Sequence, residues 1–250
     1  MKRNYLLLIL ALALISIQSH AQRKIYLSNG FEFILSGADV RFNETDVNTN
    51  MRFTLFFHMQ QHVNFDITNN IGFFTGVNIR NVGFIVEDLY QNVGFANVDN
   101  DHPNWNKNTK IKRRSYSLGF PLALKVGNFD KHFFFFAGGE YEWMFHYKQK
   151  LFIDGNKTKF TEWTSDRMNP WIPSLFAGVQ FPQGFRLKFK YYMDDFLNTS
   201  FTGEDFGQAV DYSQFQSTGV WYVSLAFFIN KKHMDQLRSG TAFDKSAYTY

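Results

Sequence analysis

The chain has 250 residues, no cysteine and a formal net charge of +4. The absence of cysteine excludes disulfide bonds, thiolate catalysis and cysteine-ligated zinc, and the modest charge, with basic residues scattered among acidic ones, gives no indication of nucleic-acid binding. Aromatic residues make up 19% of the sequence, with 31 Phe and 12 Tyr, yet the mean hydropathy is only -0.28. A chain that is aromatic and still polar on average is typical of strands in which apolar and polar side chains alternate.

The N-terminal segment has the features of a secretory signal peptide. Lys2 and Arg3 precede an apolar run over residues 5–17, and Ser19 and Ala21 place small side chains three and one positions before a cut ahead of Gln22. This run is shorter than the about 20 apolar residues that a membrane-spanning helix needs. We therefore expect residues 1–21 to be a cleaved signal peptide.

The mature chain is expected to form strands, and residues 113–126 give the clearest pattern. Large apolar side chains alternate there with small or polar ones without a break. Since successive side chains of a strand point to opposite faces, this segment is predicted to have one apolar wall and one polar wall. Similar alternation recurs in segments that we predict to be eight strands, at residues 31–42, 51–67, 71–87, 113–126, 132–148, 171–181, 185–196 and 219–229.

The links between these strands alternate in length. Short turns follow the second, fourth and sixth strands, and the longest links follow the third and seventh. Short periplasmic turns and long outer loops are typical of bacterial outer-membrane barrels, which have an even number of antiparallel strands. No stretch after residue 22 reaches the length of a membrane helix, so a spanning chain has to be a closed barrel that satisfies every backbone group.

The predicted fold is therefore all-β, a closed antiparallel transmembrane β-barrel of eight strands at residues 22–230. Asp154-Gly155 is a hairpin-type turn, so the fifth and sixth strands are expected to continue as a ribbon beyond the membrane, up to the interruption at Asn169-Pro170. A ten-strand barrel, with residues 148–163 in the wall, is the alternative. Residues 231–250 are expected to form a periplasmic C-terminal tail, flexible or available for docking.

Charged residues fall on the polar faces of these strands, which must line the lumen because a charge facing lipid costs about 2 to 4 kcal/mol at the midplane. On the fifth strand the alternation places Tyr147 outward and His146 and Lys148 inward. Buried charges need partners, so we expect a network of salt bridges in the lumen. Its predicted members are Arg52, Arg80, Lys125, Glu140, Glu142, Arg186, Lys188 and Lys190.

Two stretches resemble a known family. Residues 73–84, glycine-rich and containing Arg80-Asn81-Val82-Gly83, precede residues 113–125 with their Pro121-Leu122-Ala123-Leu124-Lys125 core. Together they are similar to two adjacent strands of the small outer-membrane β-barrel domain of Bacteroidota known from PorT-like proteins. The resemblance implies barrel construction and no reaction. It also implies a role in type IX secretion.

No pattern in the chain matches a catalytic or metal site. His58 and His62 are four residues apart, which on a strand is about 13 Å and too far for one ion. Glu140 and Glu142 are about 6.6 Å apart on one face, as in an inverting glycosidase, but cations of the seventh strand face them. His146 with Ser165 or Thr164 is the best hydrolase constellation available, and it matches no lipase motif.

The sequence thus predicts a non-enzymatic barrel in the cell outer membrane, without cofactor, metal or nucleic acid. An interior of eight strands is just wide enough to be filled by side chains, so the lumen is expected to be plugged. The expected partners are outer-membrane lipid and lipopolysaccharide, together with an envelope or secretion-system protein held by loops or tail. A lipid-modifying outer-membrane enzyme and a narrow channel remain the alternatives.

Overall fold

The computed structural model describes residues 24–55, 58–93, 95 and 101–230. The predicted signal peptide at residues 1–21 and the predicted tail at residues 231–250 lie outside the described residues. Strands dominate the rest of the chain, and the helical elements are three short 3-10 turns.

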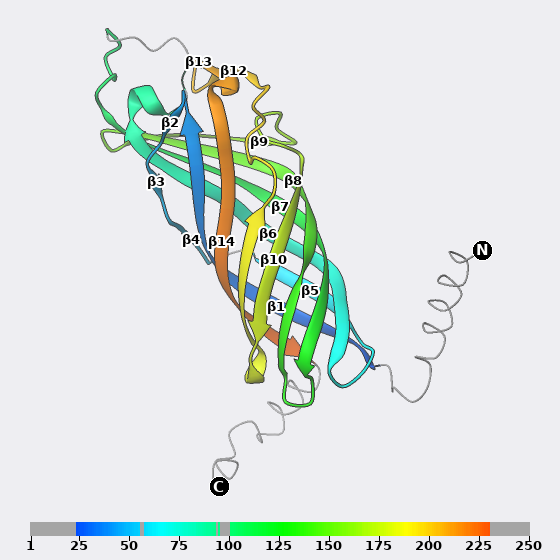
Figure 1. The fold of residues 1–250 in the computed structure, drawn as a ribbon. Coiled ribbons are helices and arrows are strands. Elements are labelled where there is room, and N and C mark those ends of the chain that lie inside the picture. The colour runs from blue at the N-terminus through cyan, green and yellow to red at the C-terminus, as the bar shows by residue number, and fades with distance from the viewer. Residues whose placement is uncertain (1–23, 56–57, 94, 96–100, 231–250) are drawn as a thin grey trace, which may run out of the picture.

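Eight antiparallel strand positions close into a ring (Figure 1). Each strand pairs with its neighbour in the chain, and β1 closes the ring by pairing with the last strand. One position is shared, because β4 and β5 both pair with β1 and are separated by a short break. In order around the ring the strands are β1 (Lys24–Phe42), β4 (Arg52–Thr54) with β5 (Met59–Asp66), β6 (Ile71–Leu89), β7 (Asn108–Asn128), β8 (Phe133–Ile153), β10 (Trp171–Gln180), β11 (Phe185–Tyr192) and β14 (Phe215–Asn230).

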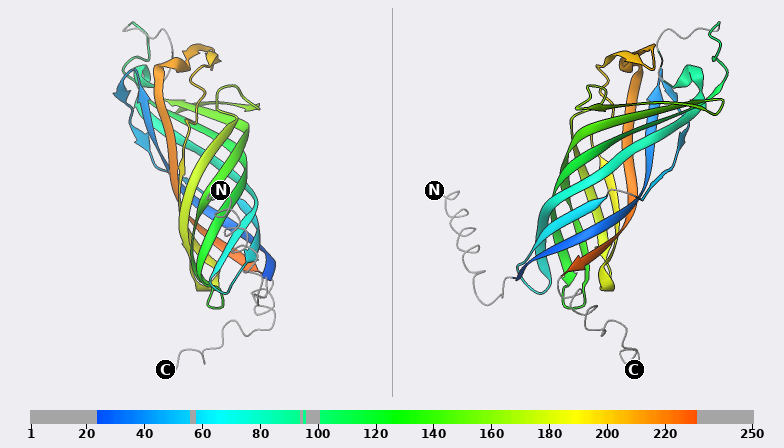
Figure 2. Two further views of the ribbon diagram at one scale, coloured as in Figure 1. Left: turned by 45° about the vertical axis from the view of Figure 1, so that its right-hand side comes forward. Right: turned by 180° about the vertical axis from the view of Figure 1, so that it is seen from behind.

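The two ends of the barrel differ. Tight links at residues 67–70, 129–132 and 181–184 lie at one end, where η2 (Pro182–Gly184) forms the last of them. The first and last described residues lie at the same end (Figure 2). The longer links at residues 90–107, 154–170 and 193–214 lie at the other end, as their lengths predicted.

Above the ring, at the end with the long links, the chain builds a second layer of structure (Figure 1). Strand β8 continues into a hairpin with β9 (Asn156–Trp163), as predicted. The predicted loop after the seventh strand contains a further hairpin, β12 (Thr202–Asp205) with β13 (Gln208–Asp211). The remaining elements of this layer are β2 (Thr45–Asp46), β3 (Thr49–Asn50), η1 (Tyr90–Asn92) and η3 (Tyr212–Gln214). We call this layer, together with the strand ends beneath it, the cap.

The ten-strand alternative is wrong. Within the described part of the chain, β9 pairs only with β8, while residues 134–143 of β8 pair with β10, the next strand of the ring. Residues 148–163 therefore form a ribbon that leaves the barrel and add no strand to its wall.

A β-bulge in β8 reverses part of the predicted facing. The register between β7 and β8 shifts so that Phe145 is an extra residue with no partner opposite. Because side chains alternate, one extra residue turns every later side chain to the other face. Tyr147 is consequently fully buried, and His146 and Lys148 point outward, so the predicted facing of these three residues is wrong.

The cap has a hydrophobic core of its own, continuous with the upper lumen. It joins the upper parts of the barrel strands to the long links, in the manner of a soluble domain. The cap thus closes one end of the ring with packed apolar side chains. Its buried members include Phe42, Phe84, Ile111, Tyr147, Tyr212 and Phe215.

Candidate functional site in the barrel lumen

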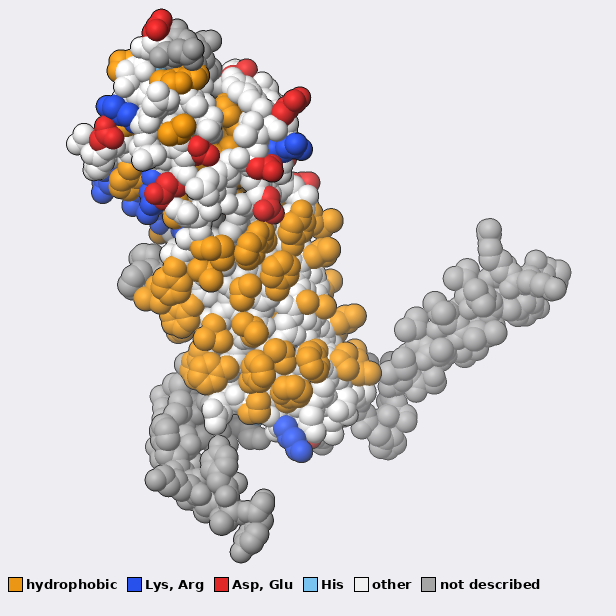
Figure 3. Space-filling model, turned by 60° about the vertical axis from the view of Figure 1, so that its left-hand side comes forward, with side chains coloured by type: hydrophobic (Ala, Val, Ile, Leu, Met, Phe, Trp, Pro, Cys, Tyr) orange, Lys and Arg blue, Asp and Glu red, His pale blue; other side chains and the backbone are white. Residues whose placement is uncertain are grey.

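The outer surface of the ring is apolar (Figure 3). On β7 the outward apolar side chains run from Val126 to Tyr116, about 33 Å along the strand at about 3.3 Å per residue. With a strand tilt of about 40°, this gives a belt about 25 Å tall, the height of the apolar band of membrane barrels. Among the described residues, no helix is long and apolar enough to cross a bilayer. The ring has the surface of a transmembrane β-barrel. Its belt includes Ile25, Leu27, Phe31, Leu122, Leu124, Phe135, Leu175, Phe189 and Leu225.

Inside the belt, three carboxylates and three cations meet in the lumen. Each is at most 5% exposed, and they come from β1, β6, β8 and β11. Strand alternation brings them together: Glu32, Glu142, Lys188 and Lys190 each lie between two outward apolar neighbours, while Arg80 follows the outward Ile79 and Glu140 precedes the outward Tyr141. We call this group the lumen charge cluster: Glu32, Arg80, Glu140, Glu142, Lys188 and Lys190.

Arg80 connects all three carboxylates. Its Nε donates to Glu32 Oε2 at 2.9 Å, and its Nη1 lies 2.6 Å from Glu140 Oε1 and 3.5 Å from Glu142 Oε1. Planar guanidinium groups suit such multiple contacts, since their donors have a fixed fork geometry. Arg80 is the centre of the cluster.

The two lysines complete the charge balance. Lys188 Nζ lies 2.5 Å from Glu32 Oε1, and Lys190 Nζ lies 2.6 Å from Glu140 Oε2 and also contacts Glu142 Oε1. Three negative and three positive side chains therefore face one another away from water. Buried charges are tolerated when they are paired and hydrogen-bonded in this way.

Neutral side chains donate further hydrogen bonds to the same three carboxylates. Hydroxyl groups of Ser117 and Tyr192 donate to Glu142 at 2.6 and 3.0 Å. Asn78 Nδ2 donates to Glu140 Oε1 at 2.6 Å, and Ser224 Oγ donates to Glu32 Oε1 at 2.5 Å. Each carboxylate thus has both ionic and neutral donors.

Three predicted members of the network lie elsewhere. Lys125 pairs with Asp66 at 2.6 Å, toward the end with the short turns. Arg52 donates to the Asn81 carbonyl at 3.1 Å and to the Asn81 side chain at 2.5 Å. The expected single network is therefore divided into a central cluster and separate pairs.

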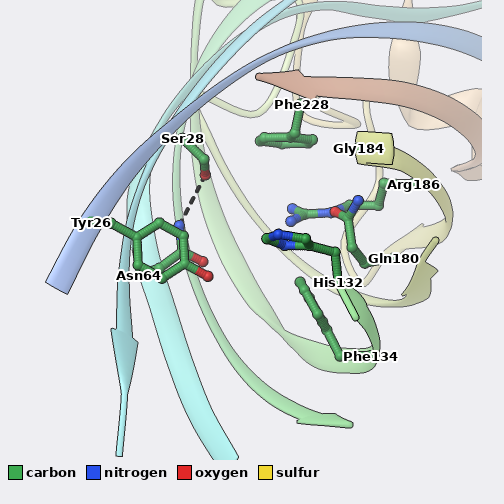
Figure 4. Close-up of a pocket in the computed structure, with 9 residues that line it drawn as sticks. All are labelled: Tyr26, Ser28, Asn64, His132, Phe134, Gln180, Gly184, Arg186 and Phe228. Atoms are coloured by element: carbon green, nitrogen blue, oxygen red, sulfur yellow. Dashed lines mark hydrogen bonds between the residues drawn. The ribbon is translucent and has the colours of Figure 1, made fainter. Parts of the chain in front are cut away.

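Arg186 is the third residue outside the cluster. It donates to Gln180 Oε1 at 3.0 Å and contacts His62 Nδ1 at 3.3 Å, and its guanidinium lies 3.9 Å from the centroid of the Phe228 ring. It lines a cavity of about 30 Å³ near the short turns, with room for only a few water molecules. Figure 4 shows its side chain between the rings of Phe228 and His132 in that view.

Apolar side chains lie on both sides of the lumen charge cluster along the barrel. Toward the short turns, an aromatic layer comprises Phe74, Ala123, Phe129, Phe134, Phe136 and Phe176. Toward the cap, Ile34, Met144, Ile172 and Tyr222 begin the continuous core described above. The charged layer is thus enclosed between two packed apolar layers.

The arrangements considered for catalysis do not form. Ser165 Oγ donates to Glu162 at 2.5 Å, while the His146 ring packs edge-on against Trp163. Glu140 and Glu142 are both bonded to cations, and this leaves neither positioned to act on a sugar. Within the described segments no group of three or more potential metal-ligating side chains comes together.

Sequence reasoning missed Glu32, which contacts two cations of the cluster. The first predicted strand, residues 31–42, contains Glu32 but contributes no residue to the predicted network, and β1 itself begins earlier, at Lys24. The signal was available, since Glu32 stands between Phe31 and Phe33 in a segment that alternates from Ile25 onward.

Comparisons with known proteins give structural similarity only. No protein-family model matches the chain, and no curated protein sequence matches it. Among solved structures, Neisserial surface protein A is 10% identical with a TM-score of 0.35, over 82% of this chain and 96% of that one. OprG, an outer membrane protein of Pseudomonas aeruginosa, is 8% identical with a TM-score of 0.35, over 84% and 97%.

Ail, the attachment invasion locus protein of Yersinia pestis, is 10% identical with a TM-score of 0.30, over 82% of this chain and 97% of that one. These similarities are too low to carry a function across. The closed antiparallel barrel is established by the strand pairing of the chain itself.

Proposed function

We propose that the protein is a non-enzymatic outer-membrane barrel with a closed lumen, which holds its cap at the cell surface to engage a partner of the envelope or of a secretion system. One observation carries this proposal: the lumen charge cluster is paired internally and enclosed between two apolar layers. A paired, dehydrated cluster offers no path for solutes and no free acid or base for catalysis. Its role is to stabilise a rigid support.

The apolar belt and the unequal ends support a place in the outer membrane. Barrels of that membrane have short turns and both chain ends in the periplasm, which puts the cap outside the cell. A PorT-like membership in the Bacteroidota barrel family is part of the proposal and rests on the resemblance of residues 73–84 and 113–125. A role in secretion follows from that resemblance, and binding of nucleic acid is not proposed.

An epitope tag tests the orientation. A tag inserted after Gly155, at the tip of the β8–β9 hairpin, should be reached by antibody on intact cells. A tag in the turn at residues 129–132 should be reached only after the outer membrane is permeabilised. Labelling in the reverse order would overturn the orientation.

Crosslinking on intact cells tests the partner. We expect mild crosslinking of the protein to capture one envelope protein in stoichiometric amount. Deletion of the β12–β13 hairpin, residues 202–211, removes part of the cap and no strand of the ring, so loss of the captured protein would place the contact on the cap and its persistence would favour the tail. Capture of no protein in any variant would contradict the partner role and reopen the enzyme and channel alternatives.

A further inference from the structure

Seven basic side chains form a continuous surface where the strands leave the apolar belt. They lie on the outward face, since the alternating residues Ile111, Arg113, Tyr147 and Gln149 are buried. We call this surface the basic ridge. It comprises Lys110, Lys112 and Arg114 on β7, Lys148 and Lys150 on β8, and Lys157 and Lys159 on β9.

Strand pairing places these cations directly against one another. Lys112 is opposite Lys150, which is in turn opposite Lys159, and Arg114 is opposite Lys148. Like charges directly opposite on neighbouring strands destabilise a sheet. Partial burial and the nearby cations of the ridge lower the pKa values of both Lys148 and Lys150. The fold thus holds together positive charges that repel one another.

Acidic side chains do little to balance the ridge. In the part of the chain that the structure describes, an acidic partner is found only for Lys110, which pairs with Glu87. The other six cations have no carboxylate within ion-pair distance there. An anion from outside the chain would relieve this repulsion.

The position of the ridge identifies the anion. Directly below it lies a group of stacked aromatic rings, among them Tyr116, Trp143, Phe145, Trp163 and Trp171. Aromatic girdles mark the boundary between hydrocarbon and headgroups. Arg114 is two residues beyond Tyr116 on the same face, about 7 Å along the strand. In Figure 3, Lys and Arg side chains at the left edge lie just above the apolar belt.

We propose that the basic ridge binds the phosphate groups of lipopolysaccharide in the outer leaflet. This proposal rests on the orientation proposed above, in which the cap faces the cell exterior. A phosphate at the level of the ridge would lie between cations of neighbouring strands, such as Lys112, Lys150 and Lys159. Each phosphate would then be within reach of two or more of these cations. The ridge then fixes the height of the barrel in the membrane and orders lipid around the β7–β9 side.

A charge-matched pair of variants tests the ridge. The ridge variant carries Lys112→Gln, Lys148→Gln and Lys150→Gln, and the control carries Arg41→Gln, Lys107→Gln and Lys131→Gln, three exposed or half-exposed cations outside the ridge. Full-length protein folded in neutral detergent is titrated with diphosphorylated lipid A. We expect the ridge variant to bind about tenfold more weakly than the control, because each surface ion pair contributes modestly and three are removed.

Two further arms identify the source of the phosphate. Dephosphorylated lipid A should bind wild type and ridge variant equally weakly, and inorganic phosphate should fail to displace lipid A at matched concentration. In lipid-free neutral detergent, the ridge variant should unfold at the same temperature as wild type or a higher one, since repulsion is removed. This readout shows that the variant folds.

Several outcomes would overturn the lipid proposal. These are equal lipid A binding by the ridge and control variants, displacement by inorganic phosphate, and a preference for a soluble polyanion over lipid A. If the epitope at Gly155 proves periplasmic, the orientation fails instead. If that epitope is exterior and lipid A does not bind, only the inference about the ridge fails.

Discussion

Replacing Arg80 with methionine is expected to destabilise the barrel by about 3–5 kcal/mol, because it leaves buried carboxylates without a counter-charge. Arg80 contacts Glu32, Glu140 and Glu142, and its side chain is 1% exposed. The lumen charge cluster would then hold three carboxylates against two lysines. The change is measured as the urea midpoint of the purified protein in micelles, followed by the gel mobility of folded and unfolded forms.

Two variants distinguish the charge cluster from a general loss of packing. Arg80→Met combined with Glu140→Gln restores equal numbers of positive and negative charges and should recover part of the lost stability. Arg41→Met, at an exposed arginine paired with Asp46, should change the midpoint little. Equal midpoints for Arg80→Met and Arg41→Met would show that the cluster does not stabilise the ring.

Removing a single acid should have a smaller but clear effect. Glu142→Gln keeps the shape of the side chain and leaves Lys190 with Glu140 as its remaining acid. Because the uncharged amide no longer balances one buried cation, the heat-induced unfolding temperature seen by gel mobility should fall while insertion remains possible.

Most of the barrel was predictable from alternation, because the lipid and the lumen impose opposite polarity on the two faces of each strand. Residues 113–126 show this best, and the structure places Lys125 inward and Leu124 outward as predicted. The short links at residues 67–70 and 129–132 indicated by their length alone which end of the barrel carries the turns and which carries the long loops. The fold class therefore followed from the alternation within each strand and from the lengths of the links between strands.

The missed features depend on contacts that a local pattern does not contain. The bulge at Phe145 requires the register of β7 against β8, and a single extra residue leaves no mark in composition. The cap core joins Phe42, Tyr90 and Tyr212 across long sequence separations, so each appeared to belong to a loop or a strand end. The division of the predicted network into the lumen charge cluster and separate pairs could be seen only from distances between side chains. Arg52 and Arg186 face the lumen as predicted and still lie outside that cluster.

The closed lumen is the central claim, and its basis is geometric. Eight strands leave an interior just wide enough for side chains. The interior here holds an aromatic layer, a paired charge cluster and an apolar core in succession. A continuous water path through these three layers is not expected, even though charged side chains face inward along the ring.

Single-channel recording in planar bilayers tests this claim most directly. The full-length mature protein is added after gel mobility has shown it to be folded, and a known porin serves as a positive control for insertion. We predict no stable open level and only occasional noise. Reproducible, long-lived conductance steps would contradict the closed lumen and mean that its charges line water.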